Sequence, residues 1–178
     1  MIKILNNPIT DNYVKLKEII LHKNFPWYYS GNSTKDFRKK EGHSNVFLFG
    51  HTFLARPEEQ NYSQPISQYF DLAKTVVNEI LTYNFMMSPA DYFLLRLNAN
   101  CTLPSHGHQY CVPHKDHEFK HVNFITYMTD SGGSTYVEGE EHQPQEDQTI
   151  IFEGEHYMKL PERYRRIVLV ATLFTWGD

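Results

Sequence analysis

The sequence predicts an α+β protein in which helices come first along the chain and a β-sandwich or barrel follows. Apolar residues are spaced as in helices over about 11–22 and again over 66–81. From Asp91 onward, short runs rich in β-branched and aromatic residues alternate with turn-forming residues. Aromatic residues make up 15% of the chain, which favours a β protein over a helical bundle.

Local signals predict the elements of the first half. IKIL at 2–5 is strand-like, and Thr10 or Asp11 can cap the first helix. NVFLFGHTFLA at 45–55 predicts a strand pair, or one strand bent at Gly50. The second helix has apolar residues at steps of three and four, namely Ile66, Phe70, Ala73, Val77, Ile80 and Leu81.

The second half is predicted to consist of strands separated by turns. These strands are YFLLRLN (92–98), VNFITYM (122–128), STYVEG (134–139), QTIIF (148–152) and RIVLVATLF (166–174). We therefore expect one domain over 1–178, in which helices and strands of 1–90 pack on a core formed by 91–175.

Composition and charge limit the class of protein. The formal charge of −4 gives no support for a phosphate-binding surface, so nucleic acid is not an expected partner. No apolar run reaches the roughly 18–20 residues of a membrane helix, so we expect a soluble protein that does not contact membranes. Cys101 and Cys111 accompany no signal segment, which favours reduced thiols and a cytoplasmic location.

The stretch PHKDHEFKH at 113–121 contains two metal-site patterns. His114 and Asp116 form an H-x-D pair, whose spacing on a strand or tight turn directs two ligands to one face. His117, Glu118 and His121 form H-E-x-x-H, which on a helix makes a zinc peptidase site with Glu118 as the base. Only one pattern suits the local structure.

The H-E-x-x-H pattern requires a helix, because only there do residues four apart share a face. Here the following residues VNFITYMT are β-branched and aromatic, so the stretch leads into a strand. The glycine and the third histidine of extended zinc peptidase motifs are missing, since those two positions hold Phe124 and Tyr127. A zinc peptidase is retained only as an alternative.

The H-x-D pair is followed downstream by a second histidine, His156, and by Arg166 at the start of the last strand. This ordered set, with FITYMTDSGGSTYV (124–137) and FEGEHYMKLPERYRRIVLVATLF (152–174), resembles the iron(II)- and 2-oxoglutarate-dependent dioxygenases. The closest type is the small prolyl-4-hydroxylase-like one. The resemblance covers about residues 90–175.

The resemblance implies a double-stranded β-helix, the jelly-roll or cupin-like fold, with supporting N-terminal helices. Iron(II) would be held by His114, Asp116 and His156, leaving positions for 2-oxoglutarate and dioxygen. Arg166 would pair with the distal carboxylate of 2-oxoglutarate, helped by the Tyr127 hydroxyl and by Thr135. The implied reaction decarboxylates 2-oxoglutarate to succinate and hydroxylates a C–H bond, with ascorbate as a stimulant.

Some positions leave alternatives open. Arg165 rivals Arg166, because only one of two neighbours on a strand points inward. Arg96 and Asn98 lie on a strand that can line the site. The 101–113 segment is longer than in the family and contains Cys101, His106, His108 and Cys111, so it is a substrate-covering loop, a second metal site or a transient disulfide. The basic run of Lys35, Arg38, Lys39 and Lys40 is expected to be a solvated loop.

The substrate implied by the resemblance is a protein or peptide, most simply at a proline. Trp27, Tyr28 and Tyr29 are candidate peptide-binding residues, together with the 101–113 loop. The alternatives are a free amino acid or other small molecule, a nucleobase, and a β-helix that binds without turnover.

Overall fold

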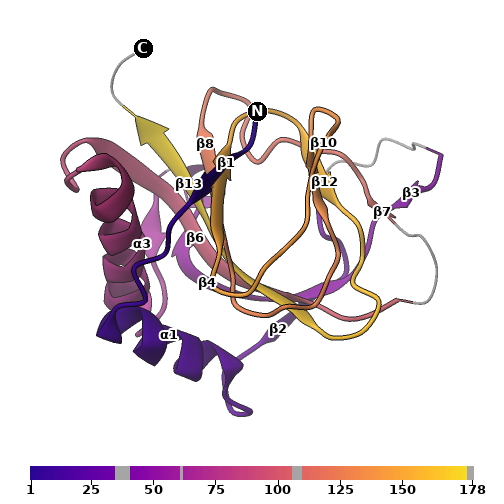
Figure 1. The fold of residues 1–178 in the computed structure, drawn as a ribbon, viewed down its shortest axis with the longest axis horizontal. Coiled ribbons are helices and arrows are strands. Elements are labelled where there is room, and N and C mark those ends of the chain that lie inside the picture. Colours follow the sequence, from indigo (N-terminus) through magenta and orange to yellow (C-terminus); the bar gives the residue numbers. More distant parts are fainter. Residues whose placement is uncertain (35–40, 61, 106–109, 176–178) are drawn as a thin grey trace.

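The protein consists of two facing β-sheets with helices covering the outer face of the larger one (Figure 1). The computed structural model describes residues 1–34, 41–60, 62–105 and 110–175. The described helices are α1 (Asp11–Leu21), α2 (Pro57–Gln60) and α3 (Phe70–Phe85). The described strands of the first half are β1 (Lys3–Leu5), β2 (Tyr28–Ser30), β3 (His43–Ser44), β4 (Leu48–Ala55) and β5 (Gln64–Pro65).

The remaining described strands are β6 (Tyr92–Thr102), β7 (Tyr110–Cys111), β8 (Val122–Tyr127), β9 (Thr135–Val137), β10 (Glu140–His142), β11 (Thr149–Phe152), β12 (His156–Met158) and β13 (Arg166–Thr175). The large sheet has the order β1-β11-β8-β13-β6-β4-β2, with β5 paired to β4. The small sheet is β10-β9-β12, and the pair β3-β7 adjoins it through a bridge between Tyr110 and Lys159. This arrangement is a double-stranded β-helix with supporting N-terminal helices, so the predicted α+β fold class is confirmed.

The strand β13 is the centre of the large sheet, as expected for the most β-forming run of the sequence. It pairs antiparallel with β6 on one side and β8 on the other. Its residues from Arg166 to Leu173 are buried on both faces, because helices cover one face and the small sheet the other.

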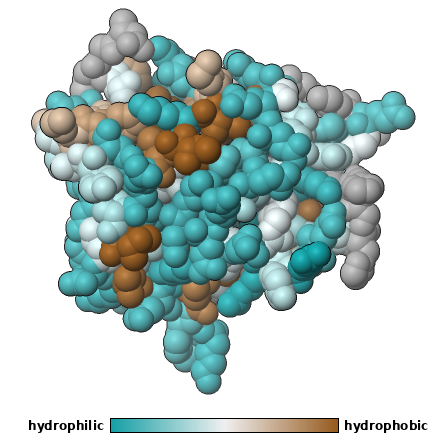
Figure 2. All heavy atoms as spheres, in the orientation of Figure 1, coloured by the Kyte–Doolittle hydropathy of each residue, from teal (hydrophilic) through white to brown (hydrophobic). Residues whose placement is uncertain are grey.

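Two apolar layers result from the alternation of side chains along these strands. The outer layer lies under α1 and α3, and it includes Leu16, Ile80, Leu97 and Leu169. The inner layer lies between the sheets and consists of Ile125, Tyr127, Val137, Ile150, Phe152, Val168 and Val170. Figure 2 shows a largely hydrophilic surface on which hydrophobic residues gather over β1, where Ile4 is exposed. Among the described residues, no helix is both long and apolar enough to cross a bilayer.

The two predicted helices, α1 and α3, differ from the prediction only at their ends, whereas the short helix α2 was not predicted. Thr10 caps α1 by accepting a hydrogen bond from the backbone N–H of Tyr13 at 3.2 Å. The second helix begins at Phe70 instead of 66 and continues to Phe85. Its start is delayed because the Ile66 N–H donates to the Phe53 carbonyl at 3.0 Å, which keeps the backbone beside β4.

The segment 45–55 forms one strand, β4, with its irregularity at a different place from the predicted one. The pairing of β4 with β6 shifts register between Thr52 and Leu54, whereas Gly50 pairs regularly with Asn100. Residues 64–65 pair as β5 on the other edge of β4 at Leu54 and Ala55, close to this shift. The predicted bend at Gly50 is therefore wrong by a few residues.

Candidate metal and co-substrate site

Two histidines of the predicted metal site lie side by side because their backbones are paired. His114 and His156 form an antiparallel bridge in which each N–H donates to the other's carbonyl at 3.0 Å. Their ring centroids are 4.6 Å apart. Pairing of β12 with the segment that follows β7 thus brings together two residues that are far apart in sequence.

The hydrogen bonds of both rings prepare them as metal ligands. Nδ1 of His114 lies 2.9 Å from the Val112 carbonyl, and Nδ1 of His156 lies 3.4 Å from the Gly154 carbonyl. A carbonyl oxygen only accepts, so each Nδ1 carries the proton and each Nε2 keeps a lone pair. Burial, together with the neighbouring His114, lowers the pKa of His156 to about 4, so its imidazole is neutral near pH 7.

Asp116 supplies the carboxylate of this group. Its Oδ2 lies 3.9 Å from Nε2 of His156, and its Oδ1 accepts a hydrogen bond from Arg96 at 2.8 Å. Burial alone would raise the pKa of Asp116, but the positive charge of Arg96, with that of Arg56, holds it well below the usual range. Asp116 is therefore a carboxylate at neutral pH.

Two imidazoles and one carboxylate are a donor set that suits iron(II). The separation of 3.9 Å is wider than the roughly 3 Å between neighbouring donors of an ion with ~2.1 Å bonds. Within the described part of the chain, no three His, Cys, Asp or Glu side chains already converge as a metal-binding group. The residues thus fit iron by donor type, and the side chains would move together on binding.

A pocket of about 80 Å³ connects this group to Arg166. That volume is several times the roughly 10–15 Å³ that one water requires. The pocket is lined by all three candidate ligands and by Thr135 and Arg166, and the N-terminal part of the chain contributes Ser33 and Leu48.

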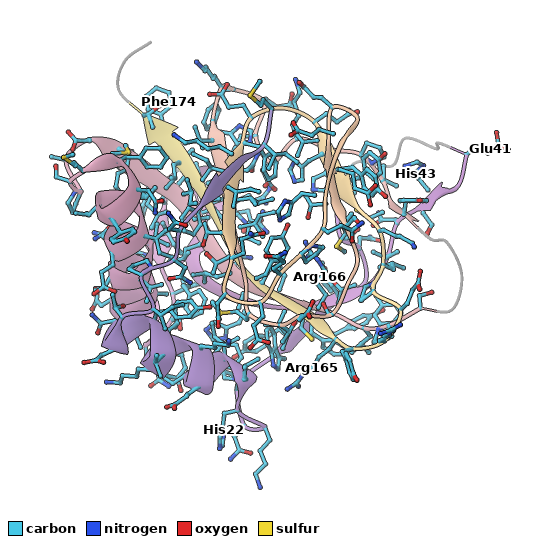
Figure 3. All side chains as sticks on the ribbon, in the orientation of Figure 1. His22, Glu41, His43, Arg165, Arg166 and Phe174 are labelled. Carbon is cyan, nitrogen blue, oxygen red and sulfur yellow. The ribbon has the colours of Figure 1, made fainter. Side chains whose placement is uncertain are left out.

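Arg166 has the properties of an anion-binding residue. It is 4% exposed, and its Nη2 donates to Thr135 Oγ1 at 3.0 Å. Its buried Nε has no hydrogen-bond partner among the described residues, so one N–H of the guanidinium is available to a ligand. Figure 3 shows Arg166 between the two sheets and Arg165 at the outside of the molecule. Arg165 is exposed and donates only weakly, to the Leu21 carbonyl at 3.4 Å.

Tyr127 lies behind Thr135 and reaches the pocket through it. The Tyr127 hydroxyl and Thr135 Oγ1 are 2.8 Å apart, and the Arg166 guanidinium stands 5.3 Å from the centre of the Tyr127 ring. The structure thus brings Arg166, Thr135 and Tyr127 together. A direct bond from Tyr127 to a carboxylate stays a prediction.

Gly133 of the turn before Thr135 needs to be glycine for two reasons. Its φ is +78°, and a Cβ would lie 2.7 Å from the Lys159 carbonyl oxygen. Gly132 has φ +68°, but a Cβ there would have nothing within 4 Å. Gly132→Ala should cost about 1 kcal/mol through the left-handed backbone alone. Gly133→Ala should cost a further 1–3 kcal/mol or so from the added clash. Equal losses in urea denaturation would contradict this assignment.

The competing H-E-x-x-H pattern has a structural role here. Residues 116–119 form a bend, not a helix. Both ring nitrogens of His117 are already bonded, Nδ1 to Glu58 at 2.5 Å and Nε2 to Thr172 Oγ1 at 2.7 Å. The geometry that a zinc peptidase requires is therefore missing.

The two cysteines lie in different clusters and both are free. Cys101 packs in the layer under the helices, and Cys111 packs with Val46 and Leu160. Burial raises the pKa of the Cys111 thiol to about 11, so it is protonated at neutral pH. His106, His108 and the basic run at 35–40 lie outside the described residues.

Sequence reasoning missed Arg56 as a site residue. Its Nη1 donates to the Asp116 carbonyl at 3.2 Å, and its Nη2 lies 3.5 Å from Asp116 Oδ1. No local pattern marks this residue, since the contact joins positions far apart in sequence. Arg96 was a candidate, and the structure places it in the pocket, whereas Asn98 does not line it.

Comparison with known proteins gives structural matches only. No family model matches the sequence, and no curated protein matches it. An oxidoreductase of the 2OG-Fe(II) oxygenase family from Burkholderia pseudomallei has a TM-score of 0.59 at 11% identity, over 83% of this chain and 72% of that chain. The collagen prolyl hydroxylase of Paramecium Bursaria Chlorella virus-1, solved with 2OG, has a TM-score of 0.57 at 12% identity, over 99% and 96%. The α-ketoglutarate-dependent epimerase SnoN has a TM-score of 0.57 at 8% identity, over 98% and 77%.

These matches define the class of the fold. The chain has the double-stranded β-helix of the 2OG-Fe(II) oxygenases. The match to the viral prolyl hydroxylase extends over almost the full length of both chains.

Proposed function

We propose that this protein is an Fe(II)- and 2-oxoglutarate-dependent oxygenase that hydroxylates a C–H bond. The observation that carries this proposal is the content of one pocket. It holds two histidines with free Nε2 lone pairs, a buried carboxylate and a buried arginine with a free N–H. A module that only binds a ligand has no need for all four groups.

Three residues would hold the metal. His114 and His156 would bind through Nε2, and Asp116 through the carboxylate oxygen that faces His156. Bound iron supplies the activation of dioxygen, which is coupled to the conversion of 2-oxoglutarate into succinate and stimulated by ascorbate. The Nδ1 hydrogen bonds orient both imidazoles and leave each Nε2 lone pair for the metal.

Arg166 and Thr135 would bind the distal carboxylate of 2-oxoglutarate. A guanidinium can donate two parallel hydrogen bonds to a carboxylate, and burial strengthens such bonds. The apolar side chains of Ile125, Val168 and Val170 line the same pocket and would exclude water from the co-substrate.

We propose a peptidyl proline as the substrate. Tyr28 and Tyr29 are 65% and 68% exposed on the edge strand β2, which pairs with β4 where Leu48 enters the pocket. Exposed aromatic rings beside a pocket suit an extended, proline-containing peptide. Trp27 instead packs on the helix-covered layer, and its ring centroid lies 4.9 Å from that of Phe25. It is therefore not part of the candidate peptide surface.

Anaerobic titration of metal-free protein with iron(II) and then 2-oxoglutarate tests the proposal. Chelation of iron by the keto acid should produce a weak charge-transfer absorption in the visible range. The His156→Ala variant should lose it, because one of three ligands is gone. The loaded wild-type protein should then add one oxygen atom to a proline-containing peptide in air, measured by mass spectrometry.

The results of this titration and of the mass measurement distinguish the proposed oxygenase from the alternatives. Absence of the absorption together with tight zinc binding would contradict the oxygenase assignment. Absorption with oxidation of free proline, but not of the peptide, would keep the reaction class and move the substrate to a small molecule. Absorption and succinate formation without an added substrate would leave both substrate classes to be screened by the same mass measurement.

A further inference from the structure

The carboxylate of Asp116 has two oxygens in different environments. Oδ1 accepts a hydrogen bond from Arg96 Nη1 at 2.8 Å and lies 3.5 Å from Arg56 Nη2. Oδ2 instead faces Nε2 of His156 at 3.9 Å. The Asp116 side chain is 6% exposed, so water does not compete strongly for either oxygen. One oxygen is therefore occupied by cations and the other is directed at the candidate metal position.

The backbone around Asp116 is held by residues that follow β4. Arg56 Nη1 donates to the Asp116 carbonyl at 3.2 Å. Glu58 of α2 bonds Nδ1 of His117 at 2.5 Å, and the other nitrogen of that ring reaches Thr172 on β13. The residue after Asp116 is thus tied both to α2 and to the central strand. These contacts fix the backbone at Asp116, and rotation of its carboxylate would break the hydrogen bond between Oδ1 and Arg96.

We propose that Arg96 and Arg56 position Asp116 so that it binds the metal through Oδ2 alone. This inference rests on the proposed function, since it concerns the same metal site. The arginines are positioning residues, because they act through Asp116. His117 of the H-E-x-x-H pattern also has a positioning role, since its ring contacts hold the backbone next to Asp116.

The consequence concerns the co-substrate. Three single-atom ligands leave three positions on a six-coordinate iron, and 2-oxoglutarate needs two of them. If both oxygens of Asp116 bound the metal, one of these positions would be lost. Arg96 and Arg56 also withdraw charge from the carboxylate, which weakens its hold on the metal. Removing Arg96 should therefore preserve metal binding and weaken 2-oxoglutarate binding.

Cobalt(II) is the probe, because its visible absorption depends on coordination number and requires no turnover. Metal-free wild-type, Arg96→Gln and Arg56→Gln proteins are titrated with cobalt(II), and then with 2-oxoglutarate. We expect Arg96→Gln to bind cobalt(II) at least as tightly as wild type, with a changed absorption intensity. Its 2-oxoglutarate affinity should fall on the order of tenfold, a usual size for effects of groups behind a ligand. Arg56→Gln should show a smaller change in the same direction, because its contact with Oδ1 is longer.

Lys115→Gln is the matched control. Lys115 is exposed and adjoins Asp116 in sequence, and the substitution removes one positive charge, as Arg96→Gln does. It should behave as wild type in both titrations. An unchanged cobalt spectrum in Arg96→Gln, or loss of cobalt and 2-oxoglutarate affinity in equal proportion, would overturn the inference. Failure of the wild-type protein itself to bind either ligand would instead contradict the proposed function. If Arg96→Gln does not fold, the less buried Arg56→Gln decides by the same two readouts.

Discussion

Asp116→Ala should abolish iron(II) binding and 2-oxoglutarate turnover, and it should also destabilise the protein. The sequence alone suggests that this variant keeps its fold. The structure alters that expectation, because the Arg96 side chain is only 15% exposed and its hydrogen bond to Asp116 at 2.8 Å would be lost. Removing one partner of a buried ion pair costs about 3–5 kcal/mol. Iron binding is measured by titration, and the free energy of unfolding by urea denaturation of the metal-free protein.

Asp116→Asn separates the two effects. Its amide oxygen can still accept the hydrogen bond from Arg96, so we expect a smaller loss of stability. It lacks the negative charge, so iron binding should still fall sharply. Turnover at the wild-type level in either variant would show that Asp116 is not a ligand. Equal stability of Asp116→Ala and wild type would show that Arg96 gains little from the pair.

Arg166→Met should raise the 2-oxoglutarate concentration needed for half-maximal turnover on the order of a hundredfold. A buried charge-assisted hydrogen bond is worth about 1.5–3 kcal/mol, and every ~1.4 kcal/mol is tenfold in affinity. The fold should tolerate the change, because Thr135 and Tyr127 can still bond each other at 2.8 Å. The measurement is succinate formation over a range of 2-oxoglutarate concentrations.

Arg165→Met is the matched control for this prediction. Arg165 is the adjacent residue with the same side chain, but it is exposed and donates only to the Leu21 carbonyl. Its 2-oxoglutarate requirement should match that of wild type. A defect in Arg165→Met alongside a normal Arg166→Met would transfer the role of the co-substrate cation to Arg165.

Much of the fold could be predicted because the decisive signals are local. RIVLVATLF predicts a buried strand by composition alone, and β13 is that strand. The N-terminal helix was predicted from a cap and an apolar face, and it spans Asp11–Leu21. The start of α3 was missed because β5 pairs with β4, a contact that no periodicity at 66–81 reveals.

The candidate site was predicted in the same uneven way. His114, Asp116, His156 and Arg166 were found through the order of motifs along the chain, and the structure places them in one pocket. Their roles as ligands and co-substrate anchor stay predictions. Arg56 could not be found, because its contact with Asp116 joins the residue after β4 to a loop distant in sequence. Propensity and periodicity describe residues that are near each other in sequence. They cannot reveal that Arg56 contacts the distant residue Asp116.

The backbone bridge between His114 and His156 makes the spacing of the two rings a property of strand register. Successive residues of a strand face opposite sides, and the Tyr157 ring stacks on Tyr136 whereas the His156 ring lies beside His114. Deletion of one residue from the turn 153–155 would therefore place Tyr157 at the register position of His156, and a phenol would replace an imidazole beside His114. The length of that turn is consequently constrained by the strand register, whereas a substitution of its exposed residue Glu153 leaves the register unchanged.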